Sequence, residues 1–225
     1  MTVPVVCIDG PSGAGKGTIS RLLAKRWSWH LLDSGALYRL AALRARQLGL
    51  ALDQVGAIAD AARTMDIVFD SDPDGGERIW LMGEEATSQV RSEAASEAAS
   101  QIAYLPELRA ALLDRQRAFL QPPGLVADGR DMGTVVFPAA QLKIFLTASI
   151  EERAQRRCKQ LKELGFDASL SHLVEVIKVR DQRDASRPIA PLRPAEDAIE
   201  LDSTQLSVDE VLQAIEDLAR ARHLV

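Results

Sequence analysis

The segment from Gly10 to Thr18 carries the clearest chemistry in the sequence, because it reads GPSGAGKGT. Glycines allow backbone N–H groups to converge on phosphate oxygens, and a helix beginning at Lys16 would add its positive N-terminal dipole. The ammonium group of Lys16 could then reach the β and γ phosphates of a triphosphate. We therefore expect ATP to bind here, at Gly10, Pro11, Ser12, Gly13, Ala14, Gly15, Lys16, Gly17 and Thr18.

The residue after Lys16 departs from the commonest form of this loop. Most such loops place a Ser or Thr there, whose hydroxyl binds Mg²⁺, whereas here Gly17 intervenes before Thr18. We expect Mg²⁺ to accompany ATP, held mainly by the phosphates and water, and assign it no direct protein ligand. The GKGT form resembles nucleoside monophosphate kinases. Guanine-nucleotide switches are the rival class, but their N-K-x-D motif needs an Asn, and the sequence contains none.

Three further segments combine arginine and aspartate in a way that suits a second anionic substrate. They read LLDSGALYR (31–39), DGRDMGTVVFP (128–138) and VRDQRDASRP (179–188). Arginine suits this task because its planar fork stays charged and grips phosphate through two hydrogen bonds. Taken alone, turn residues or ion pairs on a solvated helix face would explain these segments equally well.

Arginines at positions 153, 156 and 157 precede the last of these segments at helical spacing. A lid that closes over ATP needs such charges to meet the transferring phosphoryl group. In isolation, they would be an exposed basic face.

Strands and helices must position these residues. Short apolar runs typical of strands in a buried parallel sheet lie at 3–8, 29–35, 124–129, 142–148 and 198–201. Helical patterns follow at 16–27 and 37–48, and two more helices are expected after the capping boxes Ser149/Glu152 and Ser207/Glu210. This alternation predicts an α/β fold in which helices cover both faces of the sheet.

Two segments break the alternation. Residues 66–87 alternate apolar and polar side chains around the turn sequence DPDGG, which predicts an antiparallel hairpin inserted on the main sheet. Residues 151–187 form a highly charged helical stretch that we expect to be interrupted near Gly165.

Composition sets further bounds. The 225 residues are 47% hydrophobic and 26% charged, as in an ordinary soluble globular protein, and the net charge of -5 argues against a nucleic-acid polymer as partner. The two cysteines are far apart, which suits a reducing compartment. The first residues do not resemble a signal peptide, and no apolar stretch is long enough to span a bilayer. We expect a cytoplasmic protein.

Together, the motifs closely resemble bacterial cytidylate kinases. GPSGAGKGT, LLDSGALYR, ASQ (99–101), DGRDMGTVVFP and RDQRDASRPIAPL follow that family's order from Ile8 to about Thr204. The resemblance implies a P-loop NTP-hydrolase-like α/β fold with a five-stranded parallel sheet. It implies a single kinase domain over 1–225, with a CMP-side antiparallel insertion at about 63–95 and a helical lid at about 153–185.

The same resemblance implies the activity: transfer of the γ-phosphoryl group of ATP to CMP and dCMP, with Mg²⁺, by a monomer that binds neither nucleic-acid polymers nor membranes. It also implies residue roles. Cytosine would be read by Ser100, Arg109 and Asp131, and the ribose by Arg180 and Asp184. The CMP phosphate would be bound by Arg39, Arg130 and Arg187, in a pocket also lined by Ser34, Tyr38 and Asp128. Catalysis would fall to Lys16, Arg130, Arg187, Arg153 and Arg157, the last two facing ATP from the lid.

The chemistry of the base agrees with these residue types. Cytosine offers an amino donor at N4 and acceptors at N3 and O2, which suit a carboxylate and Arg or Ser donors respectively. Two alternatives stay open: a kinase of another monophosphate such as UMP or AMP, and a nucleotide-binding regulator without turnover.

Overall fold

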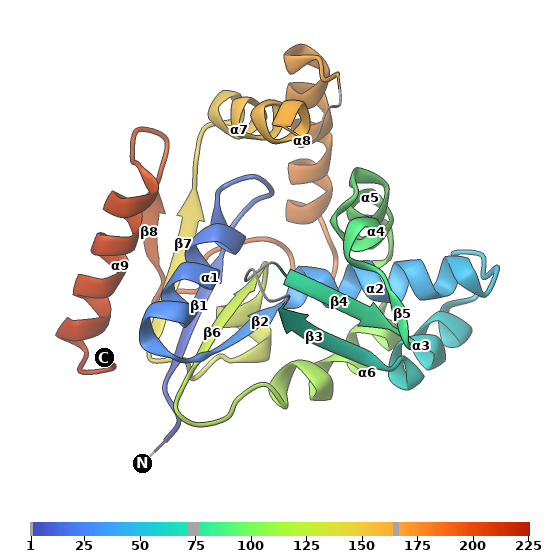
Figure 1. The fold of residues 1–225 in the computed structure, drawn as a ribbon, viewed down its shortest axis with the longest axis horizontal. Coiled ribbons are helices and arrows are strands. Elements are labelled where there is room, and N and C mark those ends of the chain that lie inside the picture. The colour runs from blue at the N-terminus through green and yellow to red at the C-terminus, as the bar shows by residue number, and fades with distance from the viewer. Residues whose placement is uncertain (1, 72–76, 164–166) are drawn as a thin grey trace. The chain divides into compact units, whose positions relative to one another are not determined.

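The computed structural model describes residues 2–71, 77–163 and 167–225 (Figure 1). The chain forms two compact units. We call the first, made of residues up to Asp33 together with Arg117–Val225, the sheet unit, and the second, Ser34–Gln116, the inserted unit.

The sheet unit is built on a five-stranded sheet with the order β2-β6-β1-β7-β8, in which every neighbouring pair is parallel. All residues of β1 and β6 are buried, as expected of inner strands covered on both faces. The expected parallel sheet is therefore confirmed. Its strands are β1 (Val5–Asp9), β2 (His30–Asp33), β6 (Leu125–Gly129), β7 (Leu142–Thr147) and β8 (Ile199–Asp202).

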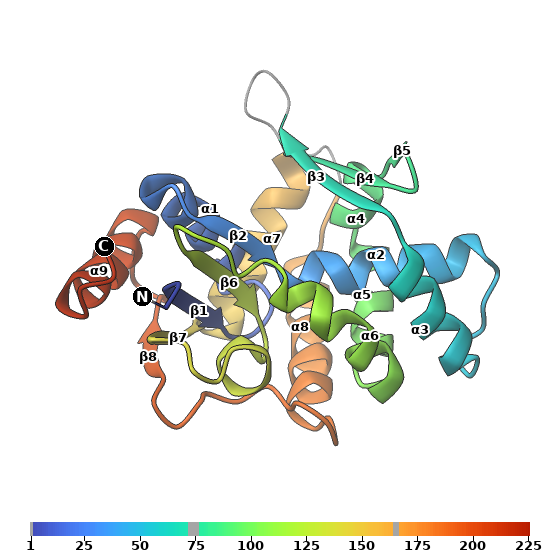
Figure 2. The same ribbon diagram turned by 90° about the horizontal axis from the view of Figure 1, so that it is seen from below.

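Two helices of this unit, α1 (Lys16–Trp27) and α9 (Val208–Ala221), pack on each other and on the sheet (Figure 2). Their apolar side chains, among them Leu23 and Ile215, share one core with Ile8 and Ile144 of the strands. The α9 capping box is confirmed: the Ser207 side chain accepts from the N–H of Glu210, whose carboxylate accepts from the N–H of Ser207.

The charged stretch forms two helices, α7 (Ile150–Glu163) and α8 (Leu170–Ala185), which pack through Ala154, Leu173 and Ile177. Ser149 Oγ accepts from the N–H of Glu152 at the start of α7. The interruption expected near Gly165 lies outside the described residues.

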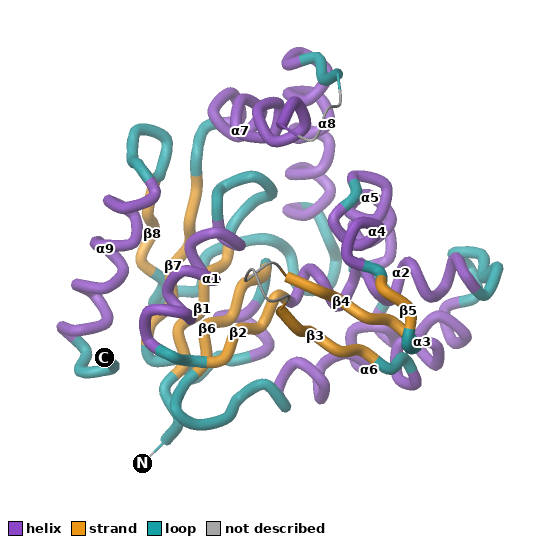
Figure 3. Tube along the Cα trace, in the orientation of Figure 1, coloured by secondary structure: helices purple, strands orange, loops and turns teal. Residues whose placement is uncertain are grey.

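The inserted unit holds several helices and a small three-stranded antiparallel sheet, β3-β4-β5 (Figure 3). The helix expected from residue 37 begins already at Ser34, directly after β2. The elements are α2 (Ser34–Gln47), α3 (Val55–Thr64), β3 (Ile67–Ser71), β4 (Glu77–Leu81), β5 (Glu84–Glu85), α4 (Thr87–Arg91), α5 (Glu93–Ile102) and α6 (Pro106–Arg117).

The expectation that this hairpin joins the main sheet is wrong. Among the described strands, β3, β4 and β5 pair only with one another. The physical reason is that β4 buries Ile79 and Leu81 within its own unit, where it packs on α4, so its apolar face needs no strand of the larger sheet. The DPDGG turn, residues 72–76, lies outside the described residues.

Gly10, which joins β1 to the phosphate loop, occupies a place that only glycine fits. Its φ is 148°, and an added Cβ would lie 2.0 Å from the carbonyl oxygen of Leu146. That carbonyl belongs to β7, which is paired on both sides. We expect Gly10→Ala to lower the free energy of unfolding by at least about 2 kcal/mol, measured by urea denaturation.

Gly56→Ala provides the matched control, because Gly56 lies in α3 and an added Cβ there meets nothing within 4 Å. This change should leave stability unchanged or raise it slightly, since alanine favours helix. Equal stabilities of the two variants would contradict the close approach of Leu146.

Candidate active site

The phosphate loop connects the buried strand β1 to helix α1. Gly13 and Gly15 have φ values of 80° and 96°, in the left-handed region that glycine adopts readily. Gly15 is the N-cap of α1, and no side chain of the described residues caps the helix there. The first N–H groups of α1 and the positive end of its dipole can therefore interact with a bound anion.

Lys16 is held inside this loop. Its Nζ donates to the carbonyl oxygen of Pro11 at 2.9 Å, and the residue is 6% exposed. Burial lowers the pKa of Lys16 to about 7, and the nearby charges of Arg130 and Arg180 act in the same direction, against Asp128 and Asp9. A bound anion would therefore strongly stabilise the charged form of Lys16.

A pH-dependent proton uptake follows from the lowered pKa of Lys16. At about pH 8 the amine is largely neutral in the free protein, whereas a neighbouring triphosphate favours the charged form. We expect ATP binding at this pH to be accompanied by proton uptake at Lys16. At about pH 6 Lys16 should take up no proton on binding, because it is then already charged. Calorimetric titrations in two buffers with different ionisation enthalpies measure this uptake.

Lys16→Arg is the matched variant for that experiment, because a guanidinium stays protonated throughout this range. It should abolish the buffer dependence. Identical binding enthalpies in both buffers for the unmodified protein would show that Lys16 does not titrate on binding.

The end of β6 and the segment after it bring a second group of charges to this region. Asp128 and Asp131 are buried, and a Cβ added at Gly17 would lie 3.4 Å from Oδ2 of Asp128. The Asp128 carboxylate thus stands beside the position at which other phosphate loops carry a hydroxyl residue. This places an acidic oxygen next to the start of α1.

Asp184, on α8, interacts with several arginines. It is 1% exposed, accepts from Arg130 Nε at 3.1 Å and pairs with Arg187. Burial raises the pKa of Asp184, but the guanidinium groups of Arg130, Arg187 and Arg180 outweigh it and hold the pKa below its usual value. One carboxylate therefore interacts with three arginines to which the family resemblance gives roles in binding the CMP phosphate and ribose.

The arginines of α7 make contacts that spacing alone does not predict. Arg153 donates to the carbonyl oxygens of Ser12 and Ala148, each at 3.0 Å, and to both carboxylate oxygens of Asp181, at 3.1 and 2.6 Å. It ties the phosphate loop to α7 and α8. Arg157 donates to Gln160 on its own helix, at 3.4 Å.

Arg156, which lies in the same helical pattern, also contacts the phosphate loop. It donates to the carbonyl oxygen of Ala14 at 3.4 Å and to that of Ser203 at 2.7 Å. Sequence reasoning grouped Arg156 with the arginines suited to a lid but did not predict these two contacts, because Ala14 and Ser203 lie far away in the chain.

The remaining expected residues lie in the inserted unit. Ser34, the first residue of α2, accepts from Gln116 Nε2 at 2.8 Å in a buried hydrogen bond. The Arg109 guanidinium lies 5.9 Å from the centre of the Tyr38 ring, and its Nη1 donates to the carbonyl oxygen of Ala103. Arg39 lies on α2 and Ser100 is buried on α5, and these two helices pack against each other.

Asp9 is a site residue that sequence reasoning missed. It ends β1, and its carboxylate oxygens accept from the N–H groups of Met132 at 2.9 Å and Gly133 at 2.8 Å. Burial raises the pKa of Asp9 to about 7, although these two hydrogen bonds act against it. The available signal was an acid at the end of an apolar run, directly before a glycine loop.

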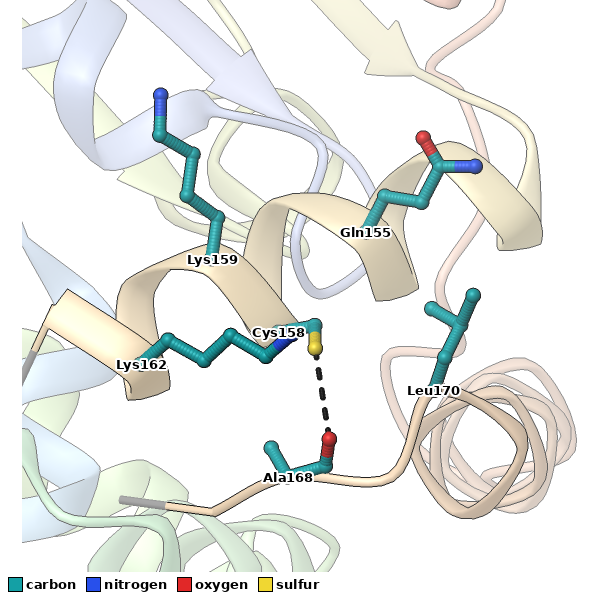
Figure 4. A pocket seen from close by; sticks show the side chains of 6 residues that line it. All are labelled: Gln155, Cys158, Lys159, Lys162, Ala168 and Leu170. Carbon is teal, nitrogen blue, oxygen red and sulfur yellow. Dashed lines mark hydrogen bonds between the residues drawn. The ribbon is translucent and has the colours of Figure 1, made fainter. Parts of the chain in front are cut away.

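A cavity of about 700 Å³ lies elsewhere, on the α7–α8 pair (Figure 4). The Cys158 thiol there donates to the carbonyl oxygen of Ala168 at 3.5 Å. None of the expected site residues is among its lining residues, which are Gln155, Cys158, Lys159, Lys162, Ala168 and Leu170.

Within the described ranges, no group of three or more His, Cys, Asp or Glu side chains is placed to hold a metal ion. No helix in the described part of the chain is long and apolar enough to cross a membrane.

The solved structures of two kinases are distant matches to this chain. In structure, the chain is similar to a shikimate kinase from Bacteroides thetaiotaomicron (TM-score 0.46, 12% identity, covering 96% of this chain and 98% of the other). It is also similar to a gluconokinase from Sinorhizobium meliloti 1021 (TM-score 0.47, 16% identity, covering 98% and 94%).

Sequence comparisons give far closer relatives. Cytidylate kinases from Stutzerimonas stutzeri strain A1501 and Pseudomonas syringae pv. tomato are each 58% identical to this chain, covering 95% and 94% of it and 93% of each relative. The cytidylate kinase of Azotobacter vinelandii is 55% identical, covering 98% of this chain and 96% of the relative. The family model for cytidylate kinase matches residues 6–221, and the chain therefore belongs to the cytidylate kinase family.

Proposed function

We propose that the protein transfers the γ-phosphoryl group of ATP to CMP, and also to dCMP, giving ADP and the corresponding diphosphate. The observation that carries this proposal is the charge arrangement within the sheet unit. Arg130 and Arg180 are close enough to Lys16 to lower its pKa, and Asp184 pairs with Arg130 and Arg187. Cations suited to an acceptor phosphate thus neighbour the lysine of the phosphate loop.

The proposed mechanism is direct in-line transfer without a covalent enzyme intermediate. The CMP phosphate is already ionised and attacks as it is, so no general base is needed. Lys16 stabilises the charge that develops on the transferred group, while Arg130 and Arg187 neutralise and orient the acceptor phosphate. Catalysis therefore consists of positioning and electrostatic stabilisation.

We infer that Mg²⁺ accompanies ATP. The oxygen donors present fit this ion, which binds through one or two carboxylates and substrate phosphates and keeps several waters. We propose that the Asp128 carboxylate contacts that hydration shell, and its closeness to Gly17 in the phosphate loop supports this. When bound, Mg²⁺ would neutralise part of the charge on the phosphates.

The roles within the CMP site rest on family membership and on chemistry. Asp131 would accept from the N4 amino group of cytosine, while Arg109 and Ser100 would donate to N3 and O2. We also propose that Arg180 and Asp184 bind the ribose. Arg39 would also bind the CMP phosphate. Ser34 and Tyr38 would line the same pocket.

We also infer a lid at about 153–185 and an insertion at about 63–95 within one kinase domain. For Arg153 to reach the transferring phosphoryl group, its guanidinium must exchange the Asp181 carboxylate for phosphate oxygens, a step that lid closure would provide. Arg157 is the other candidate for that contact. Family membership supports a cytoplasmic monomer that acts on small molecules.

Product analysis tests the proposed function. Incubation with ATP, Mg²⁺ and CMP should give CDP and ADP in equal amounts, separable by anion-exchange chromatography. A regulator that binds nucleotides without turnover would give neither product. ADP formed at the same rate without CMP would mean hydrolysis of ATP and would also contradict the proposal.

A further inference from the structure

Asp9 forms a bridge between two segments of the sheet unit that are distant in sequence. It is the last residue of β1, one position before the phosphate loop, and it is 5% exposed. Its Oδ1 accepts from the N–H of Met132 at 2.9 Å, and its Oδ2 from the N–H of Gly133 at 2.8 Å. Each carboxylate oxygen therefore has its own backbone donor.

The two donors open the short helix η1 (Met132–Val136), whose N-cap residue is Asp131. The first N–H groups of a helix need acceptors, which a nearby side chain often supplies. Here Asp9, on the neighbouring strand β1, accepts hydrogen bonds from these N–H groups. The carboxylate of Asp131 therefore does not need to cap the helix itself. The conformation of the backbone that carries Asp131 thus depends on both oxygens of Asp9.

We propose that Asp9 is a positioning residue for base recognition. By fixing the N–H groups of Met132 and Gly133, it holds the Asp131 carboxylate in the place where that group accepts from the N4 amino group of cytosine. Asp9 itself touches no substrate. The inference rests on the proposed function, because it deepens the role given there to Asp131.

The surroundings of Asp9 make this role depend on pH. Five titratable groups interact with Asp9 or with Cys7, two residues before it, and these are Asp131, Lys16, Lys143, Asp197 and the Cys7 thiol. The pKa of Asp9 is raised to about 7, chiefly by burial and also by Asp131, whereas the two backbone hydrogen bonds and Lys16 act against the rise. A protonated Asp9 would place an O–H donor against one of the two N–H groups. Base selectivity should therefore weaken as the pH falls through about 7.

Asp9→Asn tests the inference, because an amide keeps the size but offers a single acceptor oxygen and places an NH₂ group against the other N–H. We expect kcat/KM for CMP to fall about tenfold and for UMP to change little, so that the CMP/UMP ratio shrinks by a similar factor. The KM for ATP should stay within about twofold. Asp217→Asn, an exposed residue of α9, is the matched control and should change none of these values.

Two results would overturn the inference. One is a folded Asp9→Asn protein with an unchanged CMP/UMP ratio. The other is an equal loss of activity toward both substrates, which would indicate a merely structural role. Should the unmodified protein fail to phosphorylate CMP, the proposed function itself would fall, so the two failures remain distinguishable.

The unmodified protein provides a second test should Asp9→Asn not fold. Amide resonances of Met132 and Gly133 should titrate together in NMR spectra, and the CMP/UMP ratio of kcat/KM should fall between about pH 8 and about pH 6. Ionisation of the phosphate affects CMP and UMP equally and therefore cancels in this ratio, and neither base titrates in this range. A ratio that stays constant across this range would contradict the inference.

Discussion

Lys16→Ala is expected to lower kcat about a thousandfold or more while the protein remains folded. In the proposed mechanism, the ammonium group stabilises charge that develops on the transferred phosphoryl group, at a buried position where water would not replace it. Stability should not fall with activity, since burial disfavours the charged form of this lysine, as its lowered pKa indicates. Steady-state kinetics and urea denaturation of the same preparation separate the two effects.

Lys25→Ala is the matched control for this variant, because Lys25 is an exposed residue of the same helix. Its removal should leave turnover within about twofold. Near-normal turnover of Lys16→Ala would overturn the assignment of Gly10–Thr18 as the ATP-binding loop.

Asp131→Asn should reduce discrimination between CMP and UMP on the order of a hundredfold. Uracil carries a carbonyl oxygen in place of the N4 amino group and an N–H at N3, so Asp131 would face an acceptor and Arg109 a donor. Two mismatched contacts result, and each unpaired buried polar group costs about 1–3 kcal/mol. An amide at position 131 can accept or donate, so it would favour the amino group of cytosine over the carbonyl oxygen of uracil much less than the carboxylate does.

Measuring kcat/KM for both substrates with the Asp131→Asn protein decides this point. We expect a strong loss for CMP and little change for UMP. A CMP/UMP ratio equal to that of the unmodified protein would mean that Asp131 does not read the base.

Local signals predicted the phosphate loop and its scaffold well. Helix α1 occupies the expected residues, and the five strands lie within two residues of the expected runs, because buried parallel strands are short apolar segments ended by turns. The hairpin was recognisable from its period of two. Its separation from the main sheet was not, since alternation shows that a strand has one buried face but not what covers it.

Contacts over long sequence distances could not be predicted in this way. Asp9 meets Met132 only because β1 pairs with β6, and nothing near Asp9 in the sequence indicates that partner. Arg153 shows the same limit, because helical spacing predicts a charged face but not its bonds to Ser12 and Asp181. The inserted unit adds Gln116, whose bond to Ser34 joins the two ends of that unit.

The rate of ADP release with CMP, dCMP, UMP and AMP as acceptors tests the central claim most directly. A coupled assay at fixed ATP and Mg²⁺ gives kcat/KM for each acceptor under identical conditions. We predict efficient use of CMP and dCMP, a kcat/KM for UMP lower by about a hundredfold or more, and still less for AMP. Turnover of UMP or AMP equal to that of CMP, or no turnover with any acceptor, would contradict it.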